Sequence, residues 1–136
     1  MFGYYGSSTG LSATFPGIAT ASKIALNTYR IDIHCTMLVN SAPEDYFTYG
    51  IYASSICQKI LGKLPTYTMS GQCTIYNSDG TLASDIIGYG AMLLYQDHYC
   101  LSIGRYYQSS GTYGSWSLSK FVDKTYTLDG FFFVQI

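Results

Sequence analysis

The clearest pattern in the chain is an alternation of apolar and mostly polar residues from residue 29 to residue 39. The two interleaved sets are Tyr29, Ile31, Ile33, Cys35, Met37 and Val39 on one side, and Arg30, Asp32, His34, Thr36 and Leu38 on the other. A period of two is typical of a β-strand with one buried face. The segment therefore predicts a strand that turns its first set toward a core.

The same pattern continues beyond this strand. Residues 41–45 break the alternation, which restarts over residues 47–51. A further alternating run over residues 67–75 leads into the sequence Asn77-Ser78-Asp79-Gly80. Because Asp and Gly tolerate the positive φ of tight turns, this is the strongest hairpin signal in the chain.

The rest of the chain also reads as strands joined by turns. We expect a long arm over 81–95, a tight turn at 96–98, a strand over 99–107, a Gly/Ser loop over 108–115, and closing strands over 116–122 and 126–136. Many short strands with frequent turn signals predict an all-β sandwich or barrel.

Residues 52–62 do not follow the strand pattern. Ile56 and Ile60 have helical i,i+4 spacing, and Gly62 is placed to end a helix. The segment is either a short helix or another strand.

The length of 136 residues predicts one domain. The N-terminal stretch is rich in Gly, Ser and Thr with aromatic interruptions. We therefore divide the chain into an N-terminal arm or attachment segment over residues 1–24 and a single β-sandwich domain over residues 25–136.

The end of the last predicted strand is apolar on both faces. It contains Phe131, Phe132, Phe133 and Val134 in succession. Such a strand must be covered on both sides, within the domain or by another subunit. With only 11% charged and 17% aromatic residues, an isolated monomer would expose large apolar patches. These four residues are therefore the predicted oligomer interface.

The composition excludes several classes of protein. Apolar residues make up 48% of the chain, and its net charge is -1. This excludes a disordered chain, and the lack of a basic surplus argues against nucleic-acid binding. The first basic residue, Lys23, comes too late for a secretory signal, and the longest apolar run, 86–95, is shorter than the ~20 residues of a membrane helix. We expect a soluble protein without membrane insertion.

The four cysteines are Cys35, Cys57, Cys73 and Cys100, and none belongs to a C-x-x-C pair. They are either small buried reduced residues, or two disulfides in one of three pairings, or metal ligands. His34 and Cys35 are neighbours, so on a strand they point to opposite faces. We predict reduced buried thiols and no metal site.

The sequence shows no catalytic signature. The acids are scattered at turn-like positions, with Asp79 and Asp129 as examples, and the only neighbouring acid–His pair is Asp97-His98. Nucleophilic catalysis needs a base and an orienting group beside the nucleophile. We therefore predict a protein that is not an enzyme and needs no cofactor.

Tyrosine is the most informative residue type, with 15 in the chain. Tyr has an apolar ring and a polar hydroxyl, and it is enriched at recognition surfaces. The loop around residues 106–116 combines rings with small polar groups, which suits a sugar ligand, although the same rings could cap the core. The candidate glycan contacts are Tyr106, Tyr107, Gln108, Tyr113 and Trp116, with Asp97 and His98 as weaker candidates.

These features resemble the small all-β tip and head domains of bacteriophage tail fibres and receptor-binding proteins. The likeness is carried by the Tyr/Gly/Ser-rich strands, the hairpin at 77–80 and the ending Thr-Tyr-Thr-Leu-Asp-Gly-Phe-Phe-Phe-Val at 125–134. The ending is also similar to the closing strand of trimeric jelly rolls of the complement and tumour-necrosis type. The resemblance implies a jelly-roll-like antiparallel β-sandwich that assembles as a homotrimer.

The resemblance further implies a virion protein that folds in the host cytoplasm and binds a host surface polysaccharide. Its N-terminal arm would contact other virion proteins. Two alternatives remain: a purely architectural component, such as a head fibre, decoration or baseplate protein, and a secreted extracellular lectin or adhesin.

Overall fold

The computed structural model describes residues 12–41, 50–82, 90–95, 100–107, 112–115 and 124–136. Within these ranges the chain forms nine strands and one short helix, and every strand pairing is antiparallel. The predicted all-β fold is confirmed. The described strands all belong to one sheet, so the two stacked sheets of a sandwich are not seen among them.

The strands are joined in the order β1-β3-β9-β5-β6-β7-β4, with β2 also paired to β3 and β8 paired to β7. Their bounds are β1 (Ser12–Thr14), β2 (Gly17–Ala25), β3 (Thr28–Ser41), β4 (Gly50–Tyr52), β5 (Tyr67–Asn77), β6 (Gly90–Tyr95), β7 (Cys100–Tyr107), β8 (Thr112–Ser115) and β9 (Thr125–Gln135), and the helix is α1 (Ala53–Leu61).

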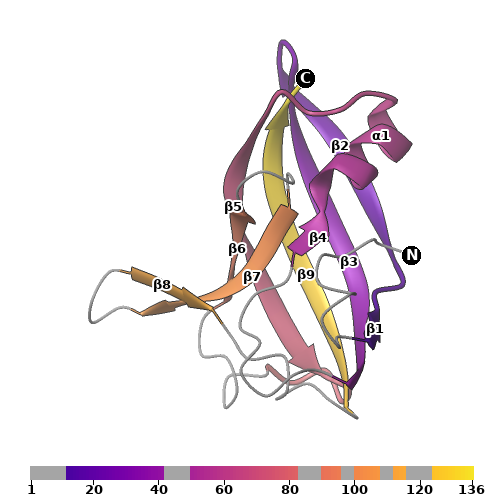
Figure 1. Ribbon diagram of the computed structural model, residues 1–136, viewed down its shortest axis with the longest axis vertical. Helices are drawn as coiled ribbons and strands as arrows, with labels where there is room; N and C mark the ends of the chain where they lie inside the picture. Colours follow the sequence, from indigo (N-terminus) through magenta and orange to yellow (C-terminus); the bar gives the residue numbers. More distant parts are fainter. Residues whose placement is uncertain (1–11, 42–49, 83–89, 96–99, 108–111, 116–123) are drawn as a thin grey trace.

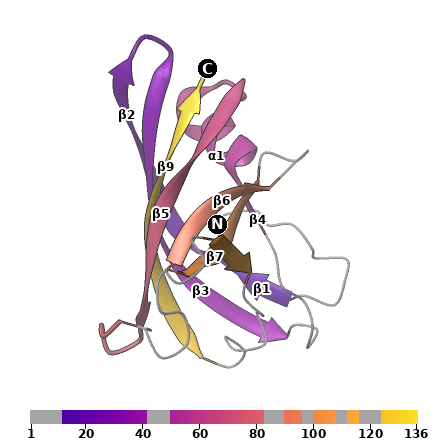
Figure 2. The same ribbon diagram turned by 90° about the vertical axis from the view of Figure 1, so that its left-hand side faces the viewer.

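The sheet curls around its own core. The long strands β3, β9 and β5 form a twisted layer that runs the length of the molecule (Figure 1). Turned by 90°, the molecule shows α1, β4, β6 and β7 on one side of this layer (Figure 2). The layer therefore has an inner face toward these elements and an outer face that no described helix or strand covers.

Alternation along the central strands builds the core on the inner face. The odd-numbered residues of β3 from Ile31 to Val39 and the even-numbered residues of β9 other than Gly130 are buried, while their neighbours are exposed or half-buried. The buried apolar residues are Phe15, Ile31, Ile33, Cys35, Met37, Val39, Ala53, Ile56, Cys57, Cys73, Ile75, Tyr126, Leu128, Phe132 and Val134. The alternation over residues 29–39 thus correctly predicted which side of β3 is buried.

The C-terminal strand β9 lies at the centre of the layer, paired with β3 on one side and β5 on the other. Phe132 and Val134 are fully buried in the core of the single chain, whereas Phe131 and Phe133 are half-buried on the outer face. The side chains of β9 that face the core are therefore covered within the single chain. Of the four residues predicted as an oligomer interface, only Phe131 and Phe133 lie on the outer face.

The segment at 52–62, which the sequence left open, is a helix from Ala53 to Leu61. It buries Ala53, Ile56 and Cys57 against the sheet, as expected from their spacing. Gly62 ends the helix with a φ of 70°, and its amide donates to the Gln58 carbonyl at 3.1 Å. This is the left-handed C-cap that glycine adopts without a steric penalty.

The predicted hairpin turn after Asn77 is confirmed. The Gly80 amide donates to the Asn77 carbonyl at 3.0 Å, and Gly80 has a φ of 87°. The Asp79 carboxylate accepts from the amide and the hydroxyl of Thr81, and these bonds lower the pKa of Asp79. The chain then returns to form a bridge between Tyr76 and Leu82.

The structure also bears on the N-terminal segment that we separated from the domain. Residues 12–14 and 17–25 belong to the sheet as β1 and β2, so the boundary predicted between residues 24 and 25 falls at the end of a strand. Residues 1–11, the predicted turn at 96–98 and the predicted strand at 116–122 lie outside the described residues.

No helix in the described part of the chain is long and apolar enough to cross a membrane.

Three cysteines are free thiols buried in the core: Cys35, Cys57 and Cys73. Burial raises the pKa of Cys57 to about 11 and those of Cys35 and Cys73 to about 12. The negative charge of Asp129 adds to the effect at Cys35. For these three the prediction of reduced, buried residues is confirmed, while the side chain of Cys100 lies outside the described part.

Alkylation tests this description of the thiols. The thiolate is the reactive form, so a buried thiol with a raised pKa should be unreactive. At pH 8 we expect iodoacetamide to leave Cys35, Cys57 and Cys73 unmodified in the folded protein and to modify all three in guanidinium chloride. Peptide mapping by mass spectrometry measures each site separately. Equal labelling in both conditions would contradict their burial.

Because they lie on opposite faces of β9, two neighbouring phenylalanines should contribute differently to the free energy of unfolding. Phe132→Ala removes a fully buried ring and should lower the free energy of unfolding by about 3–5 kcal/mol. Phe133→Ala is the matched control on the half-buried face, and it should lower the free energy of unfolding much less. Urea denaturation measures both, and Phe132→Leu preserves the comparison where the alanine variant does not fold. Equal losses would show that the assignment of the faces is wrong.

Candidate functional site

The outer face of the layer carries a regular grid of side chains set by the strand register. One row across β2, β3, β9 and β5 is Thr20, Asp32, Phe131 and Gln72. The next row is Ile18, His34, Asp129 and Thr74. Directly opposite residues of antiparallel strands share a face, so groups far apart in the sequence become neighbours here.

Arg30 is held in place by two neighbours on this face. Its Nε and Nη2 atoms donate to Oδ1 of Asp32 at 3.1 and 2.9 Å. Its guanidinium carbon lies 4.2 Å from the centroid of the Phe131 ring, a cation–π contact. The Phe131 ring in turn meets the edge of Phe133, with centroids 5.8 Å apart. The guanidinium plane is therefore oriented on an aromatic support.

A second polar pair lies one row away. Nδ1 of His34 contacts Oδ1 of Asp129, joining β3 to β9. The two side chains remain 58% and 50% exposed, and the Arg30–Asp32 pair is similarly accessible. Exposed ion pairs contribute only about 0–1 kcal/mol to stability. Their main effect here is to orient hydrogen-bonding groups on an accessible surface.

These groups surround an open depression of about 390 Å³. Its lining combines the two polar pairs with hydroxyl, amide, aliphatic and aromatic groups: Ile18, Thr20, Arg30, Asp32, Ile33, His34, Gln72, Cys73, Thr74, Asp129, Gly130 and Phe131. Such a mixture can offer donors and acceptors to a polar ligand and an apolar surface to its ring. In the described part of the chain, no three His, Cys, Asp or Glu side chains form a group suited to a metal ion.

A bulge in β5 shapes one wall of the depression. The register with β9 shifts between Met69 and Gln72, so β5 gains extra backbone there. Gly71 lies in the bulge, and a Cβ atom at this position would come within 1.6 Å of the Phe131 carbonyl oxygen. Only glycine permits this approach of the two backbones, which sets Gln72 beside Phe131.

The glycan contacts predicted from the sequence belong to another part of the molecule. Tyr106 and Tyr107 are in β7, and Tyr113 is in β8, where it pairs with Tyr106. The β7–β8 ribbon extends away from the β3–β9–β5 layer (Figure 1). The structure thus brings two of these tyrosines opposite each other. Gln108, Trp116, Asp97 and His98 lie outside the described residues.

The sequence analysis did not predict the site on the outer face, although the sequence contains part of the pattern that marks it. Arg30, Asp32 and His34 alternate along one strand, which marks one polar face in a chain with few charges. Asp129 was expected at a turn-like position, and the structure corrects this, because Asp129 lies inside β9. Its partner His34 is 95 positions away, a contact that no local pattern predicts.

No known protein family, curated protein or solved structure matches this chain.

The bulge in β5 predicts that two glycine substitutions lower the free energy of unfolding by different amounts. Gly80→Ala, in open space at positive φ, should lower the free energy of unfolding by about 1–2 kcal/mol. Gly71→Ala should cost clearly more, because its Cβ would collide with the backbone of β9. Urea denaturation of both variants provides the comparison. A Gly71→Ala variant as stable as Gly80→Ala would rule out the close approach of β5 and β9.

Proposed function

We propose that this protein is a non-enzymatic attachment protein that binds a carbohydrate on its outer face. The observation that carries the proposal is the Arg30–Phe131 stack, with Asp32, Gln72 and the His34–Asp129 pair around one open depression. Carbohydrates present hydroxyl groups around a ring with apolar faces. A shallow surface of oriented charges beside aromatic rings is complementary to such a ligand.

The hydrogen-bonding capacity of the site supports this proposal. Both bonds from Arg30 end on Oδ1 of Asp32. These two bonds do not use the Arg30 Nη1 group or Asp32 Oδ2, which can therefore donate to and accept from sugar hydroxyls. The carboxylate of Asp129 and the amide of Gln72 add further partners. Bonds to charged groups contribute about 1.5–3 kcal/mol each, enough for a selective site.

The biological setting we propose is the surface of a bacteriophage virion, with a host polysaccharide as the ligand. The resemblance of the strands and of the C-terminal sequence to tail-fibre tips supports this setting. The three buried free thiols fit folding in a reducing host cytoplasm. The homotrimer and the contact of the N-terminal segment with other virion proteins stay predictions, as does the sugar site at Tyr106, Tyr107 and Tyr113.

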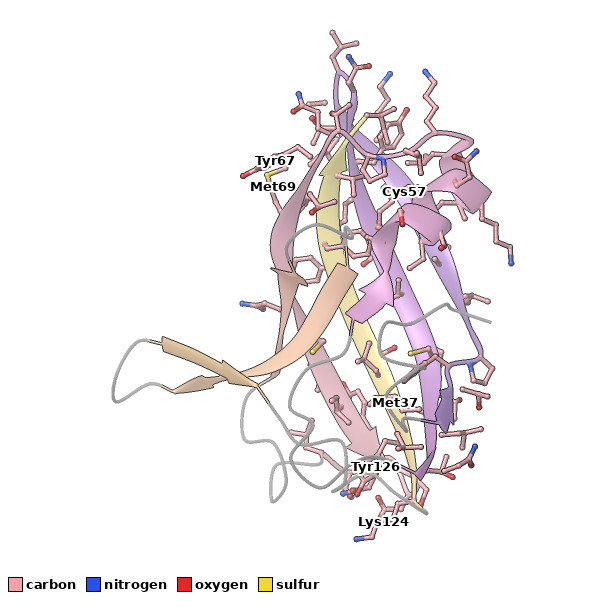
Figure 3. All side chains as sticks on the ribbon, in the orientation of Figure 1. Met37, Cys57, Tyr67, Met69, Lys124 and Tyr126 are labelled. Carbon is pink, nitrogen blue, oxygen red and sulfur yellow. The ribbon has the colours of Figure 1, made fainter. Side chains whose placement is uncertain are left out.

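An architectural role is the second candidate, and a specific surface favours it. Tyr67 and Met69 project together from β5 and are 57% and 37% exposed (Figure 3). Met69 pairs with Phe133 across the strands, so the outer face is apolar at this end. Such a strip suits contact with another virion protein. A secreted lectin would use the polar end of the same face and differ in its setting.

A glycan array with matched variants tests the proposed function. We expect the wild-type protein to bind a subset of glycans and Arg30→Ala to lose at least about tenfold in affinity, equal to about 1.4 kcal/mol. Lys59→Ala, which removes an exposed positive charge from α1, is the control and should bind normally. Circular dichroism confirms that each variant is folded.

Three results would contradict this assignment. Absence of glycan binding would favour the architectural role. Unchanged binding by Arg30→Ala would exclude the outer-face site. Loss of binding in Tyr106→Ala, with Arg30→Ala unaffected, would place the sugar on the β7–β8 ribbon instead.

A further inference from the structure

Strand β2 forms a long exposed margin of the sheet. It pairs with β3 along one side, and among the described strands none pairs with its other side (Figure 2). Its nine residues are exposed except for the half-buried Ala19. An unpaired edge of this length presents a row of backbone donors and acceptors to another strand.

The hydrogen-bond pattern shows which groups of β2 face outward. The Thr36 amide donates to the Pro16 carbonyl at 2.9 Å, and Gly17 is paired with Cys35 in the register. This makes Gly17–Cys35 a non-hydrogen-bonded pair, since bonded and non-bonded pairs alternate along antiparallel strands. Even-numbered residues of β2 therefore bond to β3. The amides and carbonyls of Ala19 and Ala21 point away from it.

We propose that β2 pairs antiparallel with β2 of a second copy of this chain, centred on Ala21. Residue 21 is the midpoint of the strand, so the regular part of this pairing covers residues 19–23, and the bulge at Lys23–Ala25 of each copy lies at its two ends. Ala21 then meets its own counterpart through outward-facing backbone groups. The remaining pairs are Gly17 with Ala25, Ile18 with Ile24, Ala19 with Lys23, and Thr20 with Ser22.

The sequence of β2 is complementary to itself in this register. Ile18 and Ile24 are 67% and 54% exposed in the single chain, and this register brings them together at each end of the paired strands, next to the bulge at Lys23–Ala25. Lys23, the one charged residue of the strand, meets Ala19, so like charges do not oppose each other. The features that commonly protect an edge, a lysine and a bulge, occur only near residues 23–25. This self-complementarity is why we assign a second copy as the partner.

Pairing of this kind would also join the outer faces. A two-fold axis perpendicular to the sheet places both outer faces on the same side of one continuous sheet. Ile18 and Thr20 line the depression on the outer face, so the two depressions would flank the shared β2 strands. This consequence for ligand binding rests on the proposed function, whereas the pairing itself does not.

Solution mass and one proline substitution test the pairing. We expect a dimer of about 30 kDa, twice the 15.0 kDa chain, by size exclusion with light scattering, in place of the homotrimer that the resemblance implies. Ala21→Pro removes an outward amide and leaves the bonds to β3 intact, so it should give a folded monomer. Ala21→Val keeps the amide and should remain a dimer. No glycan enters this measurement, so its outcome is independent of the proposed function.

A cysteine variant keeps the test decisive if Ala21→Pro does not fold. The two-fold axis places the Cα atoms of residue 21 about 5.5 Å apart, within reach of a disulfide. Ala21→Cys should therefore form an intermolecular disulfide on mild oxidation, and Ser55→Cys, at an exposed helix position, should not. A monomeric wild-type protein, a trimer unaffected by Ala21→Pro, or equal cross-linking of the two cysteine variants would overturn the pairing.

Discussion

The pairing of β9 between β3 and β5 is the constraint on which the rest of the structure depends. Its register places Phe132 opposite Ile31 on the inner face and Asp129 opposite His34 on the outer face. Because successive residues of a strand alternate between faces, a slip of one position would expose the core and bury the charges. The stability of the core and the composition of the surface site are thus fixed by the same set of backbone hydrogen bonds.

Much of this arrangement could be predicted from local sequence, and the failures have a physical cause. The alternation over residues 29–39 identified the buried side of β3, and the turn at Gly80 followed from local backbone preferences. For residues 52–62, local spacing could not decide between helix and strand, because short apolar segments suit both until packing selects one. The contact of His34 with Asp129 depends on pairing across 95 positions, which no local pattern encodes.

The two faces of the central layer differ in what they contribute. The inner face excludes water and holds nearly all the large buried side chains, so it determines stability. The outer face carries the exposed Arg30–Asp32 ion pair and the exposed His34–Asp129 contact, which add little to stability but orient Arg30 and His34. Strand β2 extends that outer face to the margin of the sheet with small, mostly uncharged residues. Ligand binding and association therefore involve adjoining parts of one surface.

The place of β9 in the chain affects how the protein is made. Both strands that β9 joins precede it, and Asp129 leaves the ribosome 95 residues after His34. At a translation rate of about 5–20 residues per second, β3 waits on the order of 5 to 20 seconds for its central partner. During that interval the apolar side of β3 lacks the strand that completes its core. The nascent chain therefore depends on slow, long-range closure before its core is complete.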